Sequence, residues 1–73
     1  MSKPQSKSRH IAANIAYYLD MHCMTKTDLA GRIMISRAAL SRKFADPERF
    51  TVREIERISR VFKIDPVELL KPR

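Results

Sequence analysis

The sequence predicts an all-α domain, a compact bundle of five short helices. Apolar residues recur at spacings of three and four, which is the period of an amphipathic helix rather than of a strand. Residues suited to helix N-caps precede five such segments. The chain has one glycine in 73 residues, with no Asn-Gly or Gly-Gly pair, and this argues against β-hairpins.

Residues 1–8 are expected to form a flexible basic arm, because they are polar and include a proline. Residues 9–71 are expected to form the folded domain. Its first helix is predicted over about 9–22, where apolar and aromatic side chains recur at helical spacing. Those side chains belong to Ile11, Ile15, Tyr18, Leu19 and His22.

The next two helices are predicted to be short. Thr25, with Asp28 three residues later, caps a helix over about 26–33. Ser36 caps another over about 37–44. The side chains predicted to point inward from this pair are Leu29, Ala30, Ile33, Leu40 and Phe44.

Two further helices are predicted after a loop at Pro47. Thr51 and Glu54 have the spacing of a capping box. The apolar face of the helix that follows comprises Val52, Ile55, Ile58, Val61 and Phe62. Asp65 and Pro66 then begin a short fifth helix that is expected to end near Leu70.

The charge balance indicates a polyanionic partner. Fifteen Lys and Arg against eight Asp and Glu give a net charge of +7. Such an excess suits nucleic acid first and an anionic membrane surface second. Cys23 has no partner for an intramolecular disulfide, which favours a reducing compartment such as the cytoplasm. No apolar run approaches the length of a membrane span.

Catalysis and metal binding are not expected. No nucleophile can be matched with a base, and Gly31 alone makes no phosphate-binding loop. His22 and Cys23 are adjacent, but no second pair of ligands stands at a suitable spacing. We therefore expect no enzyme activity, no metal and no cofactor.

The most informative region runs from Thr25 to Phe44. Only Met34 and Ile35 separate its two predicted helices, so the helices should cross at a steep angle. If the apolar side chains face inward, the second helix must present Arg37, Ala38, Ser41 and Arg42 outward. Arginine pairs with guanine, serine bonds to several base edges and alanine touches the thymine methyl group, so these side chains suit the DNA major groove. The alternative is a merely solvated surface, which is less expected within this basic stretch.

The stretch Ile15 to Leu70 resembles the Cro/CI-type, or XRE-like, helix-turn-helix repressors of phage and bacteria. The matching residues include Met24-Thr25, Leu29-Ala30, Ile35-Ser36, Leu40-Ser41 and Thr51. The resemblance implies a lambda-repressor-like DNA-binding domain, with the helix-turn-helix at helices two and three and with helix three reading the major groove. It also implies a cytoplasmic location, in a prokaryote or a phage-infected host.

The same resemblance implies which side chains approach the DNA backbone. These are Lys26, Thr27, Ser36, Lys43, Arg49 and Arg53. Lys3, Lys7 and Arg9 of the arm are expected to reach a phosphate or the minor groove, the alternative being a tail that only aids solubility. A further stripe of Arg53, Arg57 and Arg60 is interpreted mainly as a solvated face, partly paired with Glu54 and Glu56.

One departure from the family pattern lies at the turn between the two helices. The family usually has glycine at the turn where this chain has Met34. A residue other than glycine at positive φ costs roughly 1–2 kcal/mol. The sequence therefore predicts local strain in the turn, or a turn of different shape.

The expected partner is double-stranded DNA, bound as a homodimer on a pseudo-palindromic operator, with a monomer in solution as one possibility. The resemblance places the dimer surface near Val67, Leu69, Leu70 and Phe62, although these residues could equally close the core. Two alternatives are a protein-interaction module of antitoxin or antirepressor type, and a basic amphipathic peptide at membranes. The repeated helix caps argue against the second.

Overall fold

The computed structural model describes residues 7–72, with side chains from His10 onward. Within that range the chain is entirely helical and turn-forming, so the predicted all-α class is confirmed. Its elements are α1 (Lys7–Met21), α2 (Lys26–Arg32), α3 (Arg37–Ala45), the 3-10 helix η1 (Pro47–Arg49), α4 (Val52–Phe62) and the 3-10 helix η2 (Pro66–Leu69).

The predicted fifth α-helix is a 3-10 helix, so the described residues contain four α-helices rather than five. The predicted cap is present, because Asp65 Oδ1 accepts a hydrogen bond of 3.0 Å from the Val67 N–H. The next bonds, Glu68 N–H to Asp65 O and Leu70 N–H to Val67 O, join residues three apart. A segment this short gains too few bonds to offset the cost of starting an α-helix, and the tighter turn is favoured.

The predicted starts of α2, α3 and α4 are confirmed. Thr25 and Asp28 exchange hydrogen bonds of 3.0 and 3.1 Å, so an aspartate completes the capping box of α2. The Ser36 hydroxyl accepts a bond of 3.0 Å from the Ala39 N–H at the start of α3. Helix α1 begins at Lys7, two residues before the predicted start. The predicted arm therefore overlaps α1 at residues 7–8, and its residues 1–6 lie outside the described part of the chain.

Three helices end on a residue in the left-handed region. After α2, the Met34 N–H bonds to Gly31 O and the Ile35 N–H to Ala30 O, at 3.3 and 3.0 Å. This pair of bonds defines a Schellman motif, whose closing residue needs a positive φ and is usually glycine. The same bond pattern closes α1 and α4. The closing residues are Cys23 (φ 52°), Met34 (φ 64°) and Lys63 (φ 59°).

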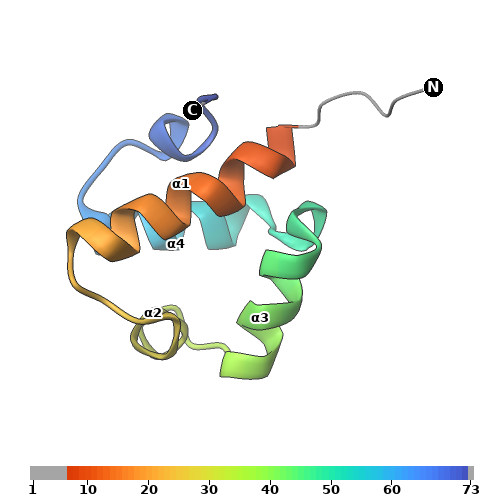
Figure 1. Cartoon of the computed structure of the whole chain (residues 1–73), viewed down its shortest axis with the longest axis vertical. Coiled ribbons are helices and arrows are strands. Elements are labelled where there is room, and N and C mark those ends of the chain that lie inside the picture. The colour runs from red at the N-terminus through yellow and green to blue at the C-terminus, as the bar shows by residue number, and fades with distance from the viewer. Residues whose placement is uncertain (1–6, 73) are drawn as a thin grey trace.

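The helices enclose one apolar core. Figure 1 shows α1 running across the molecule, with α2 and α3 below it and η2 above it. Stacked rings of Tyr18 and Phe62, with centroids 5.5 Å apart, join α1 to α4. Helix α2 packs against α3 and α4, while η1 and η2 pack against α1. The buried apolar residues are Ile11, Ile15, Leu19, Leu29, Ala30, Ile33, Leu40, Phe50, Ile55, Ile58, Phe62 and Leu69.

Two residues assigned to apolar faces are exposed. Val52 is the first residue of α4 and is 73% exposed. His22 follows the end of α1 and is also exposed, although its ring lies 5.2 Å from that of Phe62. Both stand at helix ends, where the periodic pattern continues in the sequence but the neighbouring elements no longer cover it.

Sequence reasoning missed a polar residue in the core. Asn14 is fully buried in α1, and its Nδ2 donates hydrogen bonds to Leu69 O at 2.9 Å and Lys71 O at 2.8 Å. These bonds fasten the C-terminal segment to the first helix. The sequence did contain a signal for the burial of Asn14, because this residue lies within the apolar stripe that includes Ile11 and Ile15.

Candidate nucleic-acid interface

Helices α2 and α3 cross steeply over a shared apolar wedge. In Figure 1 α2 is seen end-on while α3 lies in the plane of the view. Leu29 and Leu40 are fully buried between them, and Ala30, 2% exposed, leaves room for a close approach. Ile35 in the connection is half-buried against the same core. The predicted helix-turn-helix geometry is therefore present.

One face of α3 is turned to solvent. Successive residues of an α-helix are rotated by about 100°, so Arg37, Ala38, Ser41 and Arg42 lie within one arc of about 140°. All four side chains are exposed. Next to this arc, on the side turned to the core, Leu40 is buried and Phe44 is half-buried. The structure thus brings together, on one outward surface, the side chains that sequence reasoning assigned to base reading.

The cationic groups on this face are available to a ligand. Among the described side chains, no carboxylate forms an ion pair with Arg37 or Arg42. Each guanidinium carries five donors in a planar fork, and the Ser41 hydroxyl both donates and accepts. Such a face can bind the acceptor-rich edges of base pairs or the oxygens of phosphates.

The residues assigned to the DNA backbone border this face. Lys26 is the first residue of α2, and its ammonium lies 4.2 Å from the centre of the Phe44 ring, so a cation–π contact holds it beside α3. Thr27 is exposed on the same helix. Ser36 uses its oxygen as the N-cap of α3, and its hydroxyl proton can still be donated to a phosphate.

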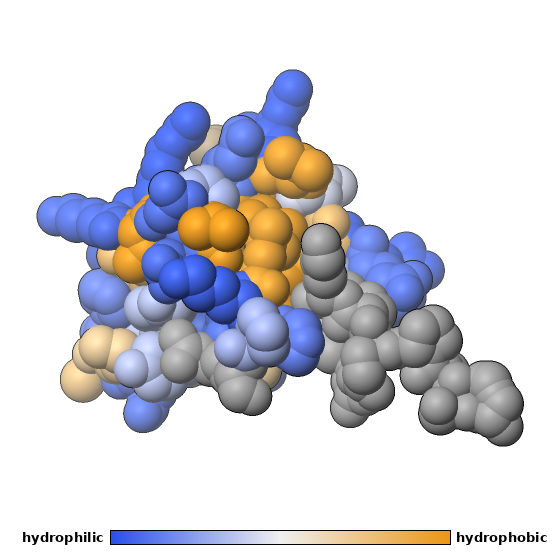
Figure 2. Space-filling model, turned by 90° about the horizontal axis from the view of Figure 1, so that it is seen from above, coloured by the Kyte–Doolittle hydropathy of each residue, from blue (hydrophilic) through white to orange (hydrophobic). Residues whose placement is uncertain are grey.

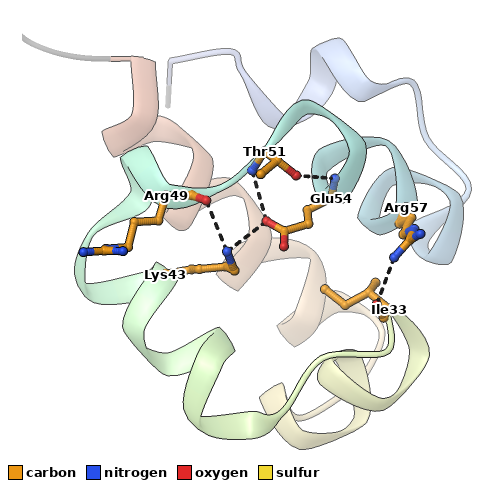
Figure 3. A network of polar contacts seen from close by, with 6 residues as sticks. All are labelled: Ile33, Lys43, Arg49, Thr51, Glu54 and Arg57. Carbon is orange, nitrogen blue, oxygen red and sulfur yellow. Dashed lines mark hydrogen bonds and ion pairs between the residues drawn. The ribbon is translucent and has the colours of Figure 1, made fainter.

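Lys43 differs from the other backbone candidates, as Figure 3 shows. Its Nζ lies 3.1 Å from Glu54 Oε1 and donates a hydrogen bond of 3.2 Å to Arg49 O. The same Glu54 oxygen accepts a bond of 3.0 Å from the Thr51 N–H, completing the capping box of α4. The Lys43 and Glu54 side chains are only 17% and 15% exposed. Sequence reasoning identified the box but not this third partner.

The electrostatics of Glu54 follow from these contacts. Burial disfavours the charged carboxylate, but the Thr51 N–H and the Lys43 ammonium both favour it. The favourable contacts outweigh the burial, and the pKa of Glu54 is lowered below its ordinary value of 4.5. Glu54 is therefore ionised at neutral pH and compensates the charge of Lys43.

The remaining basic candidates are exposed. Arg49 lies 3.3 Å from Asp46, but both side chains are largely solvated, so this pair constrains Arg49 weakly. Arg53 is exposed at the first turn of α4. The predicted pairing of the α4 arginines with Glu54 and Glu56 is absent among the described side chains. Arg57 instead donates a long bond of 3.5 Å to Ile33 O, at the end of α2.

The candidates in the arm are less fully described. Lys3 lies outside the described residues. The backbone of Lys7 and Arg9 forms part of α1, but the side chains of these two residues lie outside the described part of the chain. Cys23 is exposed. Within the described residues, no cluster of three or more His, Cys, Asp or Glu could hold a metal ion. No helix in residues 7–72 has the length and apolar character to cross a membrane.

Two short helices crossed over an apolar wedge, with the second presenting an exposed cationic face, define a helix-turn-helix protein of the DNA-binding class. Comparison with protein families agrees with this assignment. The chain belongs to the family of the Cro/C1-type HTH DNA-binding domain, which matches residues 14–72. This is a family of DNA-binding regulators rather than of enzymes. Searches of curated proteins and of solved structures gave no match.

Proposed function

We propose that the protein is a sequence-specific regulator of transcription that places α3 in the major groove of double-stranded DNA. The observation that carries this proposal is the outward face of α3, on which Arg37, Ala38, Ser41 and Arg42 are all exposed. A helix of this width fits the major groove, where each base pair presents a distinct pattern of donors, acceptors and methyl groups.

Binding has two components. The basic residues around α3 displace condensed counterions from the phosphates, which gives an attraction that depends on salt but not on sequence. In this role we place Lys26 beside α3, Arg49 after it, and Arg53 at the start of α4. Arg37 and Arg42 then select the site through base edges, and each bidentate contact contributes on the order of 1–3 kcal/mol of discrimination.

A homodimer on a pseudo-palindromic operator would supply the affinity that one module lacks. A single module offers about 600–1,000 Å² of contact, and two recognition helices about 34–36 Å apart would enter successive major grooves. Phe62 and Leu69 close the core, at 2% and 0% exposure, whereas Val67 is 49% exposed. Figure 2 shows apolar side chains gathered on the face that includes α1 and η2, bordered by hydrophilic ones. This face is the proposed dimer surface.

The biological role follows from the family and from the binding mode. A small domain that occupies a promoter blocks access to it, so we infer repression in a prokaryotic or phage setting. The protein would act in the cytoplasm, where such DNA lies. The arm residues Lys3, Lys7 and Arg9 would add contacts beside the groove. The mechanism requires no cofactor.

The first test is titration of random-sequence DNA over a range of salt concentrations. A dimer that neutralises about eight phosphates should give a log–log slope of binding constant against salt near −7. Binding that shows no salt dependence would contradict the proposal and would favour a protein-interaction module. Selection of bound sites from random DNA then gives the operator and its half-site spacing.

Substitutions separate base reading from backbone binding. Arg37→Ala and Arg42→Ala should each relax preference at one base pair of each half-site. Lys26→Ala should weaken all sequences alike and reduce the salt slope of the dimer by about 1.8, because each protomer loses one phosphate contact. Arg60→Ala, which removes an exposed arginine of α4, is the matched control and should leave sequence preference unchanged. If Arg37→Ala and Arg42→Ala weaken every sequence equally, the assigned reading face is wrong.

A further inference from the structure

We propose that the ion pair of Lys43 and Glu54 is a positioning device that fixes the orientation of α3, and that Lys43 is not a contact to the DNA backbone. This inference rests on the proposed function, because it concerns how the reading face is presented to base pairs. It replaces the role that the family resemblance implies for Lys43.

The position of Lys43 on α3 supports the inference. At about 100° per residue, Lys43 lies outside the arc occupied by Arg37, Ala38, Ser41 and Arg42. Its side chain extends toward α4, where its Nζ reaches Glu54 Oε1 at 3.1 Å (Figure 3). The ammonium is therefore directed away from the surface that would face base pairs.

The network joins three successive elements. Lys43 stands in the last turn of α3, and its Nζ also donates to the carbonyl of Arg49, the last residue of η1. Glu54 in the first turn of α4 accepts the Thr51 N–H through the same oxygen that contacts Lys43. The end of the recognition helix is thus attached to the following turn and to the capped start of α4.

Burial distinguishes this ion pair from the others. Lys43 and Glu54 are 17% and 15% exposed, whereas Arg49–Asp46 is 67% and 56% exposed and Lys71–Glu68 is 57% and 35% exposed. Solvent screens a shielded pair less, so this pair can hold a fixed geometry. Glu54 also neutralises the ammonium, which leaves Lys43 little net attraction for a phosphate.

Orientation affects discrimination more than general affinity. Hydrogen bonds to base edges weaken steeply as their angles depart from linearity. Attraction to phosphates comes from counterion release and tolerates small rotations. Arg42 precedes Lys43 directly, so a rotation of α3 that follows loss of the pair would move a base-reading guanidinium. We expect the preference for the selected site to fall while binding to random DNA is retained.

The test uses a charge-neutral double variant, Lys43→Met with Glu54→Gln. Glutamine retains the acceptor of the capping box, and the net charge of the chain is unchanged. Affinity for the selected site should fall by about tenfold, the loss of one modest bidentate contact. The salt slope on random DNA should stay the same. Lys43→Met alone and Glu54→Gln alone should each lose as much discrimination as the double variant, because either change removes the same ion pair.

A matched control and a rescue complete the experiment. Arg60→Met with Glu56→Gln makes the same charge-neutral change at two exposed residues of α4 and should change neither the affinity for the selected site nor the salt slope. Lys43→Arg, which keeps the charge and the reach, should retain discrimination. Circular dichroism at the assay temperature verifies folding; if the double variant unfolds, Glu54→Gln alone gives the comparison.

Two results would overturn the inference. Both can be distinguished from the result expected if the proposed function itself is wrong. If the double variant weakens selected and random DNA equally and reduces the salt slope of the dimer by about 1.8, Lys43 contacts a phosphate in each protomer. If Glu54→Gln alone tightens binding to both DNAs without loss of preference, the pair only masks a charge. Failure of the proposed function would appear instead as an absence of salt-dependent DNA binding in the unaltered protein.

Discussion

Replacement of Met34 by glycine should stabilise the protein. Met34 closes the Schellman motif after α2 with a φ of 64°. In this conformation the Cβ of any L-residue crowds the following carbonyl oxygen, and glycine avoids the contact. The Met34 side chain is 85% exposed, so removing it eliminates few packing contacts.

The expected gain is the difference between two effects. Relief of the left-handed conformation contributes roughly 1–2 kcal/mol. The greater freedom of glycine in the unfolded chain offsets about 0.5–1 kcal/mol of this gain. A net stabilisation of about 0.5–1 kcal/mol should raise the melting temperature by several degrees, since 1 kcal/mol corresponds to about 4–8 °C in a domain of this size.

Chemical and thermal denaturation followed by circular dichroism measure the effect of Met34→Gly. Ala13→Gly is the control, because Ala13 is exposed in the middle of α1 and its replacement should destabilise the helix by about 0.5–1 kcal/mol. Opposite signs for the two glycine substitutions would support the reasoning. A loss of stability in Met34→Gly similar to that in Ala13→Gly would refute it, because conformational strain at position 34 would then be negligible.

Three further outcomes are expected. Gly31→Ala should stabilise α2 by about 0.5–1 kcal/mol, because an added Cβ meets no atom within 4 Å; a drop in melting temperature would show hidden crowding. Asn14→Ala should destabilise the fold by about 2–3 kcal/mol, since two carbonyls lose the donor that reaches them at 2.8 and 2.9 Å, and a change below 0.5 kcal/mol in urea denaturation would contradict this estimate. Acid should also destabilise the protein. The backbone N–H of Thr25 lowers the pKa of Asp28 below 3.8, and that of Glu54 is likewise below 4.5. A carboxyl with a lowered folded-state pKa stabilises fully above its unfolded-state pKa and loses this contribution as pH falls through the folded-state value. The free energy of unfolding should therefore decline below about pH 5, and Glu54→Gln should flatten that decline; an unchanged pH dependence in this variant would argue against the contribution of Glu54.

Much of the fold could be predicted because its determinants are local. A cap involves a side chain and a backbone N–H two or three residues away, as at Thr25, Ser36 and Asp65. The pattern at Asp65 was insufficient to specify an α-helix, because the length of a helix also depends on what the chain packs against. For the same reason Val52 fits the periodic pattern yet is exposed.

The exposed face of α3 was predictable for a related reason. Once Leu40 is assigned to the interior, helical periodicity places Ala38 and Arg42 opposite it and Ser41 to one side. Arg37 is exposed at the first position of α3. Lys43 was harder to assign, because its partner Glu54 belongs to another helix and already had a recognised role as a cap. Its charge and its position in the chain suggested that Lys43 contacts DNA, whereas the fold brings the end of α3 within ion-pair distance of Glu54 at the start of α4.

The sequence by itself determined the starts of α2, α3 and α4, the inward and outward faces of α2 and α3, and the excess of positive charge. These properties depend on residues within about one helical turn of each other, or on composition alone. Only the tertiary structure decided that Asn14 holds the C-terminal segment and that Lys43 pairs with Glu54. Both contacts require segments from different helices to meet at hydrogen-bonding distance, and that meeting is set by how the whole core packs.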